Sequence, residues 1–109
     1  MDDYLEEHLA DKINIDLLCR VFKMSRSSLY NFSLENYGMG ITEYLSRLRV
    51  KRAEEYLCTT DMTVSQVAES VGFADNNYFI KVFKKYSGCP PKEWKNRYTK
   101  NKMIKNAIN

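Results

Sequence analysis

The sequence predicts an all-α protein built from two helix-turn-helix subdomains joined by a long linker helix, with about seven helices in total. Two observations lead to this prediction. Apolar residues recur at steps of three and four along most of the 109 residues, and no stretch sustains the period of two that is typical of a β-strand. One half of the chain also repeats the other at a distance of about fifty residues, which indicates a duplicated unit.

The periodic stretches define seven expected helices. They are residues 2–10, 15–22, 26–37, 42–58, 64–71, 76–87 and 91–99. Residue types that accept hydrogen bonds from free backbone N–H groups stand at several of the expected starts. These capping residues are Asn14, Ser25, Thr63 with Gln66, and Asp75. Pro91 fits the first turn of the last helix, where an N–H group would have no partner in any case.

The repeat gives each half of the chain a short helix, a tight turn and a capped second helix. Residues 13–38 match residues 62–88 at a shift of 49 before the turn and 50 after it. The aligned pairs are Leu18 and Val67, Cys19 and Ala68, Phe22 and Val71, Ser25 and Asp75, Leu29 and Phe79, Gly38 and Gly88, Glu43 and Glu93, and Tyr44 and Trp94. Cys19 and Ala68 are small enough for a close helix crossing, and Gly72 can adopt a positive φ in the second turn. This is the helix-turn-helix pattern, used twice.

The expected organisation is a single domain with four parts. They are a first helix-turn-helix subdomain over 1–38, a linker helix over 39–58, a second subdomain over 59–98 and a basic tail over 99–109. A helical hairpin without any nucleic-acid role would account for either copy alone. Two copies in register, each with a capped second helix, favour the helix-turn-helix interpretation.

The net charge of +3 is unevenly distributed along the chain. The first 19 residues contain six acidic residues and one lysine, a net charge of −5, so the rest of the chain carries +8. A basic body of this size favours a polyanionic partner, nucleic acid before a membrane surface. A solvated, lysine-rich surface fits the composition equally well.

The composition argues against several other classes of protein. No segment approaches the roughly 20 apolar residues of a membrane span, and the acidic start differs from a signal peptide, so a cytoplasmic location is expected. Three widely spaced cysteines and one histidine fit neither a metal site nor a disulfide framework, so no metal or cofactor is expected. No nucleophile–base arrangement or phosphate-binding glycine loop indicates an enzyme.

The stretches YLSRLRVKRAEEYL and TDMTVSQVAESVGFADNNYFIKVFKKYSGCPPKEW resemble the DNA-binding domain of AraC/XylS-family transcriptional regulators. The resemblance covers roughly residues 13–98. Its signature residues in the second half are Ala68, Gly72, Phe73, Asp75, Tyr78, Phe79, Phe83, Lys84, Gly88 and Pro91. It implies a bacterial regulator that binds promoter or operator DNA in two successive major grooves, with an N-terminal sensor or receiver domain missing from this chain. Ser33 replaces the family's usual phenylalanine, so the first subdomain is expected to pack less tightly or to bind DNA less strongly.

The expected base contacts come from the outward faces of the second helix in each subdomain, where helical periodicity and the resemblance agree. The candidates are Ser27, Tyr30, Asn31, Asn76, Asn77 and Lys81. Asparagine can pair bidentately with adenine, and lysine can donate to guanine. Ile80 fits partial burial somewhat better than a thymine contact. Leu34 also lies outward, and the sequence gives no reason for it beyond partial compensation for Ser33.

The expected phosphate contacts come from four basic residues. They are Arg26, Arg49, Lys84 and Lys85. Arg26 lies beside a helix amino terminus, where backbone N–H groups also favour an anion. Arg49 matches a family arginine and fits two uses equally, a structural pair with an acidic neighbour or a contact with the DNA backbone. Lys84 and Lys85 fit phosphate contacts or simple solvation, and the basic tail is expected to be disordered and weakly attracted to DNA.

The linker helix sets an expected spacing between the two recognition helices. About 17 residues span roughly 25 Å, which predicts recognition helices about 34 Å apart and a direct, non-palindromic pair of boxes about 10 base pairs apart. The alternative hypothesis is a protein-interaction module that contacts RNA polymerase or another regulator and binds little DNA itself. The weakly basic first recognition helix is its best support.

Overall fold

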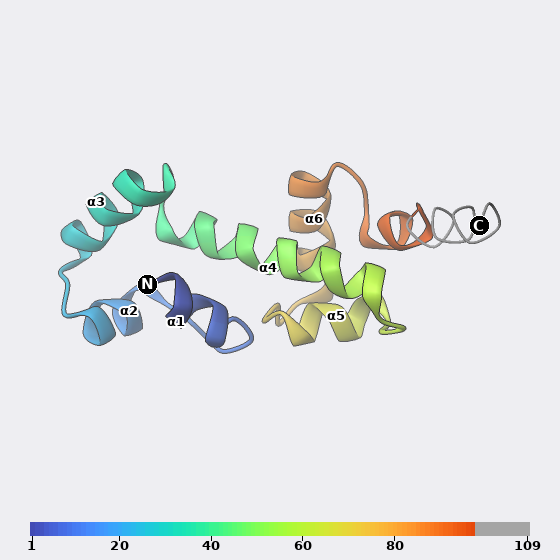
Figure 1. Cartoon of the computed structure of the whole chain (residues 1–109), viewed down its shortest axis with the longest axis horizontal. Helices are drawn as coiled ribbons and strands as arrows, with labels where there is room; N and C mark the ends of the chain where they lie inside the picture. Colours follow the sequence, from blue (N-terminus) through green and yellow to red (C-terminus); the bar gives the residue numbers. More distant parts are fainter. Residues whose placement is uncertain (98–109) are drawn as a thin grey trace, which may run out of the picture. The chain divides into compact units, whose positions relative to one another are not determined.

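The structure is a computed structural model that describes residues 1–97, and its contacts group into two compact units. The first unit is Met1–Arg49, and the second is Val50–Asn109, described as far as residue 97. The labelled helices in Figure 1 are α1 (Asp2–Glu7), α2 (Ile15–Phe22), α3 (Arg26–Tyr37), α4 (Ile41–Thr59), α5 (Val64–Ser70) and α6 (Asn76–Ser87). Residues 91–97 are also helical, and residues 1–97 contain no strand, which confirms the all-α prediction. The expected basic tail, 99–109, lies outside the described residues.

The predicted helix boundaries are close to the observed ones except at α1. This helix ends at Glu7, three residues before the expected end at position 10. The backbone N–H of Asp11 donates to the carbonyl of His8 at 2.9 Å, and the Asp11 carboxylate lies 2.9 Å from Nδ1 of His8. These two contacts close a turn at the point where the periodicity alone predicts more helix.

The structure confirms the four predicted N-terminal caps, Asn14, Ser25, Thr63 and Asp75. In the second unit the cap is reciprocal, because the Thr63 N–H donates to Gln66 Oε1 at 2.9 Å and the Gln66 N–H donates to Thr63 Oγ1 at 3.1 Å. Such caps satisfy backbone donors that the first turn of a helix leaves free. They therefore fix where α3 and α6 begin, and with that which of their residues face outward.

Six buried side chains form the core of the first unit. They are Leu5, Leu9, Leu18, Leu29, Ile41 and Leu45. Leu5 belongs to α1 and is fully buried, so the acidic first helix is part of this unit. Asp2 also connects α1 to α4, because the hydroxyl of Tyr44 donates to its carboxylate at 3.1 Å.

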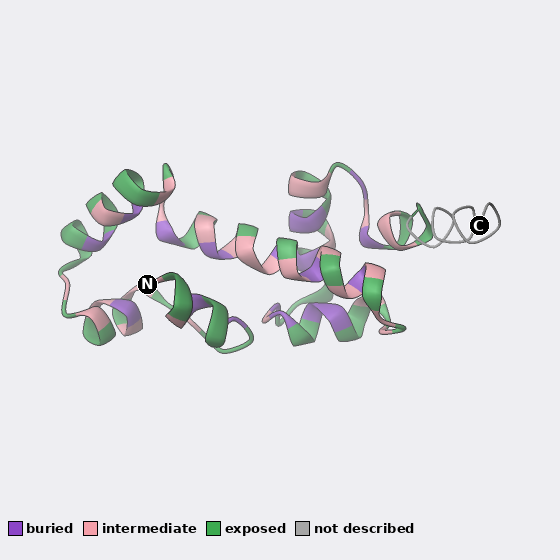
Figure 2. Cartoon of the chain, in the orientation of Figure 1, coloured by how far each residue is buried: buried purple, intermediate pink, exposed green. Residues whose placement is uncertain are grey.

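A separate core, rich in aromatic rings, fills the second unit. Its buried members are Val50, Ala53, Leu57, Val67, Ala68, Val71, Phe73, Phe79, Val82 and Phe83. Figure 2 shows buried segments along α4, α5 and α6, which supply most of these side chains. The ring centroid of Phe79 lies 5.1 Å from that of Phe73 and 5.7 Å from that of Phe83, in tilted contacts that aromatic rings favour. One side of α6 is therefore committed to packing.

The predicted repeat recurs in the backbone hydrogen bonds of the two turns. The N–H of Met24 donates to the carbonyl of Cys19 at 3.0 Å, and the N–H of Phe73 donates to the carbonyl of Ala68 at 2.9 Å. The two donors, Met24 and Phe73, are 49 residues apart, and so are the two acceptors, as the alignment requires. The two turns therefore share one backbone geometry although their sequences differ.

One position in this shared turn requires a left-handed backbone. Gly72 has a φ of 99°, and Lys23, which aligns with it, has a φ of 53°. Glycine adopts such angles without steric cost, whereas a lysine has its Cβ close to the backbone there. The first turn therefore carries a local strain that the second turn avoids.

Ser33 occupies the position that Phe83 fills in the second unit. Both side chains are fully buried, and the Ser33 hydroxyl donates to the carbonyl of Met39 at 2.6 Å. An aromatic contact is formed one turn later instead, because the ring of Tyr37 stacks on that of Tyr44 with centroids 3.7 Å apart. In the second unit the corresponding contact joins Phe83 to Trp94. The sequence predicts that the first subdomain packs less tightly or binds DNA less strongly. At Ser33 the structure has a hydrogen bond, and one turn later it has a stacked aromatic pair.

Candidate nucleic-acid interface

The outward side of α6 carries the predicted base-contact residues of the second unit. Asn76, Asn77 and Lys81 are exposed, whereas Phe79 and Phe83, one turn apart on the opposite side, are fully buried. The carboxylate of Asp75 accepts from the backbone N–H groups of Asn77 at 2.8 Å and Tyr78 at 3.2 Å, which holds the first turn in place. The side-chain amides therefore stand on a fixed backbone. Their contact with bases stays a prediction.

Positive charge accumulates along the same side of α6. Lys81, Lys84 and Lys85 are all exposed, and this helix contains no acidic residue. The ammonium group of Lys85 lies 5.3 Å from the ring centroid of Tyr86, a distance at which a cation–π contact forms. Ile80 is half-buried and packs against the core, as the sequence predicts. The three lysines give this face the charge that phosphate binding requires.

The outward side of α3 is polar but nearly uncharged. Ser27, Tyr30 and Asn31 are exposed, and Leu29 is buried beneath them. Phe32 is half-buried. The structure therefore brings the three predicted base-contact residues of the first unit onto one accessible side, where their contact with DNA stays a prediction.

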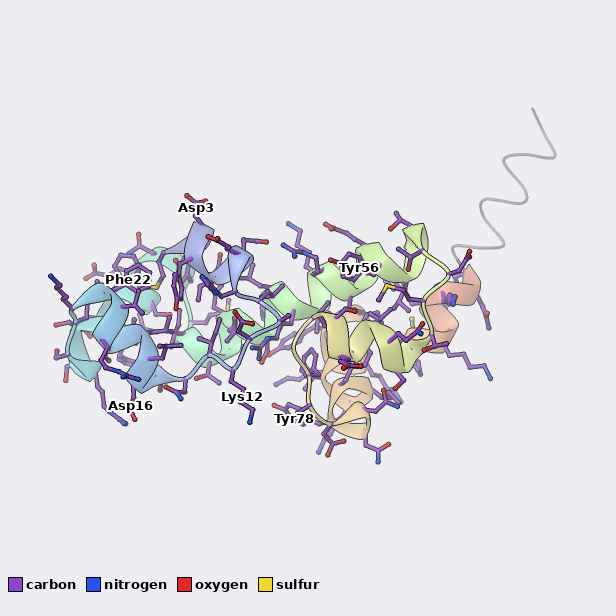
Figure 3. All side chains as sticks on the ribbon, turned by 90° about the horizontal axis from the view of Figure 1, so that it is seen from below. Asp3, Lys12, Asp16, Phe22, Tyr56 and Tyr78 are labelled. Carbon is purple, nitrogen blue, oxygen red and sulfur yellow. The ribbon has the colours of Figure 1, made fainter. Side chains whose placement is uncertain are left out.

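Arg26, the basic residue at the start of α3, has a partner within its own unit. One of its Nη atoms donates to the carboxylate of Asp16 on α2, and both side chains are well exposed. Figure 3 shows Asp16 at the outer surface of its helix. Exposed pairs of this kind contribute little to stability, so a DNA phosphate can take the place of the carboxylate. The predicted phosphate contact of Arg26 therefore requires an exchange of partners.

Arg49 has structural partners in the first unit. Its Nε donates to the carbonyl of Leu9 and one Nη to the carbonyl of Asp11, each at 3.1 Å. The side chain is half-buried, and burial lowers the pKa of its guanidinium. The sequence leaves open a pair with an acidic neighbour or a contact with the DNA backbone, and the partners in these two bonds are backbone carbonyls, which tie the segment after α1 to α4. Its phosphate contact stays a prediction.

Two exposed side chains on these helices were not among the predicted site residues. Tyr78, in the first turn of α6, is 55% exposed, and Figure 3 shows it extending away from the ribbon. Leu34, on α3, is 40% exposed. Tyr78 belongs to the family signature, which gave it no role in the site, while its position three residues after Asp75 could have indicated an accessible first turn. For Leu34 the periodicity gave the correct direction but no reason.

The geometry of the two units defines a class of protein. Each unit contains two helices in contact, a tight turn between them and a capped second helix with an accessible polar side, which together make a protein with two helix-turn-helix motifs. The family described as "Helix-turn-helix domain" matches residues 18–97 of the chain. The chain belongs to the AraC/XylS family of helix-turn-helix DNA-binding domains, whose members are bacterial transcription regulators and not enzymes.

The relatives agree in sequence and in fold. The chain is 31% identical over 96 residues to the transcriptional activator RhaR of Mannheimia succiniciproducens. The matched region covers 88% of this chain and 35% of RhaR. The C-terminal domain of the response regulator yesN from Fusobacterium nucleatum is similar with a TM-score of 0.81 and 33% identity, over 86% of this chain and 92% of the other. The chain spans about a third of the length of the curated relatives it matches.

One solved structure extends the likeness in fold. The DNA-binding domain of AdpA, solved in complex with a target DNA, has a TM-score of 0.88 to this chain at 24% identity, over 91% of this chain and 89% of the other. At this level of identity the similarity concerns the fold alone. Among residues 1–97, no helix is long and apolar enough to cross a membrane.

Proposed function

We propose that this chain is the DNA-binding module of a longer bacterial transcription regulator, and that α3 and α6 enter successive major grooves of a promoter or operator. The observation that carries the proposal is the duplication, because each unit presents one capped helix with an accessible polar side. The AdpA domain of the same fold, which was solved with its target DNA, supports it. The name of RhaR, a transcriptional activator, supports the regulatory role.

The proposed DNA site consists of two unlike boxes in direct orientation. The two helices carry different side chains, and their units are related by repetition, so a palindromic site is not expected. The centres of the boxes should lie about 10 base pairs apart, one turn of DNA. The base contacts are assigned to Ser27, Tyr30, Asn31, Asn76, Asn77 and Lys81, and the phosphate contacts to Arg26, Arg49, Lys84 and Lys85.

Two further partners are proposed beside DNA. A sensor or receiver domain is expected on the amino-terminal side, since the yesN domain that resembles this chain is the C-terminal domain of a response regulator. RNA polymerase is a further expected partner, and the cytoplasm is the expected compartment, because the promoter DNA of bacteria is found there.

In vitro selection from random duplex DNA with the full chain tests the proposal. The expected result is enrichment of two different short boxes, in direct orientation, with centres about 10 base pairs apart. A chain with both Asn31→Ala and Asn77→Ala serves as the control, and it should lose preference at one base in each box. Enrichment of an inverted repeat, or of no sequence at all, would contradict the proposal.

A second candidate function is a protein-interaction module with little DNA binding. It is favoured by the charge of α3, whose charged residues are Arg26 and Glu35, with Arg26 paired to Asp16. Gel shifts on random-sequence DNA over a series of salt concentrations distinguish the two functions. DNA binding predicts retardation at low salt that weakens as salt rises, and the alternative predicts no retardation at any concentration.

A further inference from the structure

Among residues 1–97, three large apolar side chains with high exposure lie on the two helices proposed to contact DNA, and a fourth lies on α2. Within the described part of the chain, those exposed are Val21, Tyr30, Leu34 and Tyr78. Tyr30 is 57% exposed and Leu34 is 40% exposed, and they lie four residues apart on α3. Residues at this spacing are neighbours on one side of a helix. A single exposed leucine needs no explanation, but a tyrosine–leucine pair on the groove-facing side of a recognition helix does.

The repeat shows which residues of α6 correspond to the outward residues of α3. The aligned residues are Asn31 and Lys81, Leu34 and Lys84, and Glu35 and Lys85. All three lysines of α6 are exposed, so the second unit meets DNA with three cations at positions where the first unit has an amide, an apolar side chain and a carboxylate. The first unit therefore needs another way to hold and to distinguish bases.

We infer that the first unit reads an A·T-rich box, in which Tyr30 and Leu34 pack against thymine methyl groups while Asn31 pairs with adenine. The inference rests on the proposed DNA-binding function. In the major groove the C5-methyl group of thymine is the apolar group that the four bases present, and asparagine matches the N6 and N7 atoms of adenine. Guanine is read most often by arginine or lysine, and the one basic residue of α3, Arg26, is its first residue and is assigned above to a phosphate.

With this assignment, the first unit supplies binding energy that does not depend on salt, and the second unit supplies the part that does. Contacts with methyl groups and amide–base pairs release no counterions, so they add affinity and preference without adding to the salt dependence. The lysines of α6 supply the salt-dependent part. Removing one buried methyl contact should weaken binding about threefold to fourfold.

Uracil substitution tests the inference, because uracil pairs like thymine but lacks the methyl group. The full chain first selects its site from random duplexes, and the box whose preference changes in Asn31→Ala is assigned to the first unit. Deoxyuridine then replaces each thymine of that box in turn. The unsubstituted chain should bind at least one such duplex about threefold to fourfold more weakly. The variants Tyr30→Ala and Leu34→Ala should bind the thymine duplex more weakly but should lose this penalty.

Val21→Ala is the matched control, because Val21 is 42% exposed but lies on α2. It should keep the full uracil penalty, and all variants should retain the helical circular dichroism of the unsubstituted chain. A first box without A·T pairs, or a uracil penalty that is absent or that persists unchanged in both α3 variants, would overturn the inference while leaving DNA binding intact. Failure of the chain to select any sequence would instead remove the proposed function itself.

Discussion

At the scale of single residues, neighbouring side chains on α6 are expected to do different work. Asn77→Ala or Lys81→Ala should weaken binding to the selected site by about 1–3 kcal/mol and relax the preference at one base, because each can pair with a base edge. Lys84→Ala should weaken binding to all sequences alike and reduce the salt slope by about 1, as a phosphate contact does. Fluorescence anisotropy on the site and its single-base variants, at several salt concentrations, measures both effects.

Lys12→Ala is the control for these variants, since Lys12 is exposed and lies outside the helices. It should leave the affinity and the base preference of the chain unchanged. If Asn77→Ala and Lys81→Ala behaved like this control, the exposed side of α6 would not be the side that reads bases.

Lys23 lies at a position that glycine fills in the other unit. Its φ of 53° places the Cβ in a crowded left-handed conformation, so Lys23→Gly should raise the free energy of unfolding by about 0.5–1 kcal/mol. Arg20→Gly, within α2, should lower it by about 1 kcal/mol, because there the φ is helical and glycine only adds unfolded-state freedom. Urea denaturation measures both. Destabilisation by Lys23→Gly would mean that the side chain has a stabilising contact that outweighs its backbone strain.

The tyrosine pair of the first unit predicts a dependence on alkaline pH. Burial, and then the neighbouring carboxylate of Asp2, raise the pKa of Tyr37 and that of Tyr44 above the ordinary value of about 10. A folded-state pKa above the unfolded one stabilises the protein at every pH below about 10, and this stability is lost as the pH rises further. Urea denaturation between about pH 8 and 11 should show a fall that Tyr37→Phe with Tyr44→Phe reduces. An equal fall in the double variant would contradict this account.

At the scale of elements, α1 is a structural part of the first unit although it precedes the residues that the family matches. Leu5 is fully buried, so Leu5→Ala should lower the free energy of unfolding by about 2–5 kcal/mol. Glu7→Ala, on the exposed side of α1, should change it by less than about 0.5 kcal/mol. Thermal unfolding followed by circular dichroism compares the two variants. Equal stability of both variants would show that α1 does not support the core.

The helix starts were predictable from nearby residues, whereas the end of α1 was not. Asn14, Ser25, Thr63 and Asp75 were predictable as caps because each bonds to a backbone N–H two or three residues away. The early end of α1 was not predictable from periodicity, because the turn contacts between His8 and Asp11 end the helix within an apolar pattern that continues to Leu9. The apolar periodicity predicted that the helix exists, and the turn between His8 and Asp11 decided where it ends.

At the scale of the whole molecule, the proposal depends on how the two units share one DNA site. If each unit occupies one box, inserting 5 base pairs between the boxes turns the second box to the opposite face of the duplex. Affinity should then fall to about that of a duplex with a single box, because both units can no longer engage at once. Anisotropy titrations with two-box, inserted and single-box duplexes measure this. An insertion without effect would show that the units bind independently.

The sequence by itself determined the helices, their caps and the polar outward sides of α3 and α6, because these depend on residues within about one helical turn of each other. It also determined the duplication, because the same pattern of residues recurs about fifty positions further along the chain. The tertiary structure decided what periodicity cannot specify. The hydroxyl of Tyr44 meets Asp2 42 residues away, and Arg49 meets the carbonyl of Leu9 40 residues away. It also decided that Tyr37 supplies the aromatic contact that Ser33 cannot make. Such partners are selected when distant segments pack together, so only the folded chain reveals them.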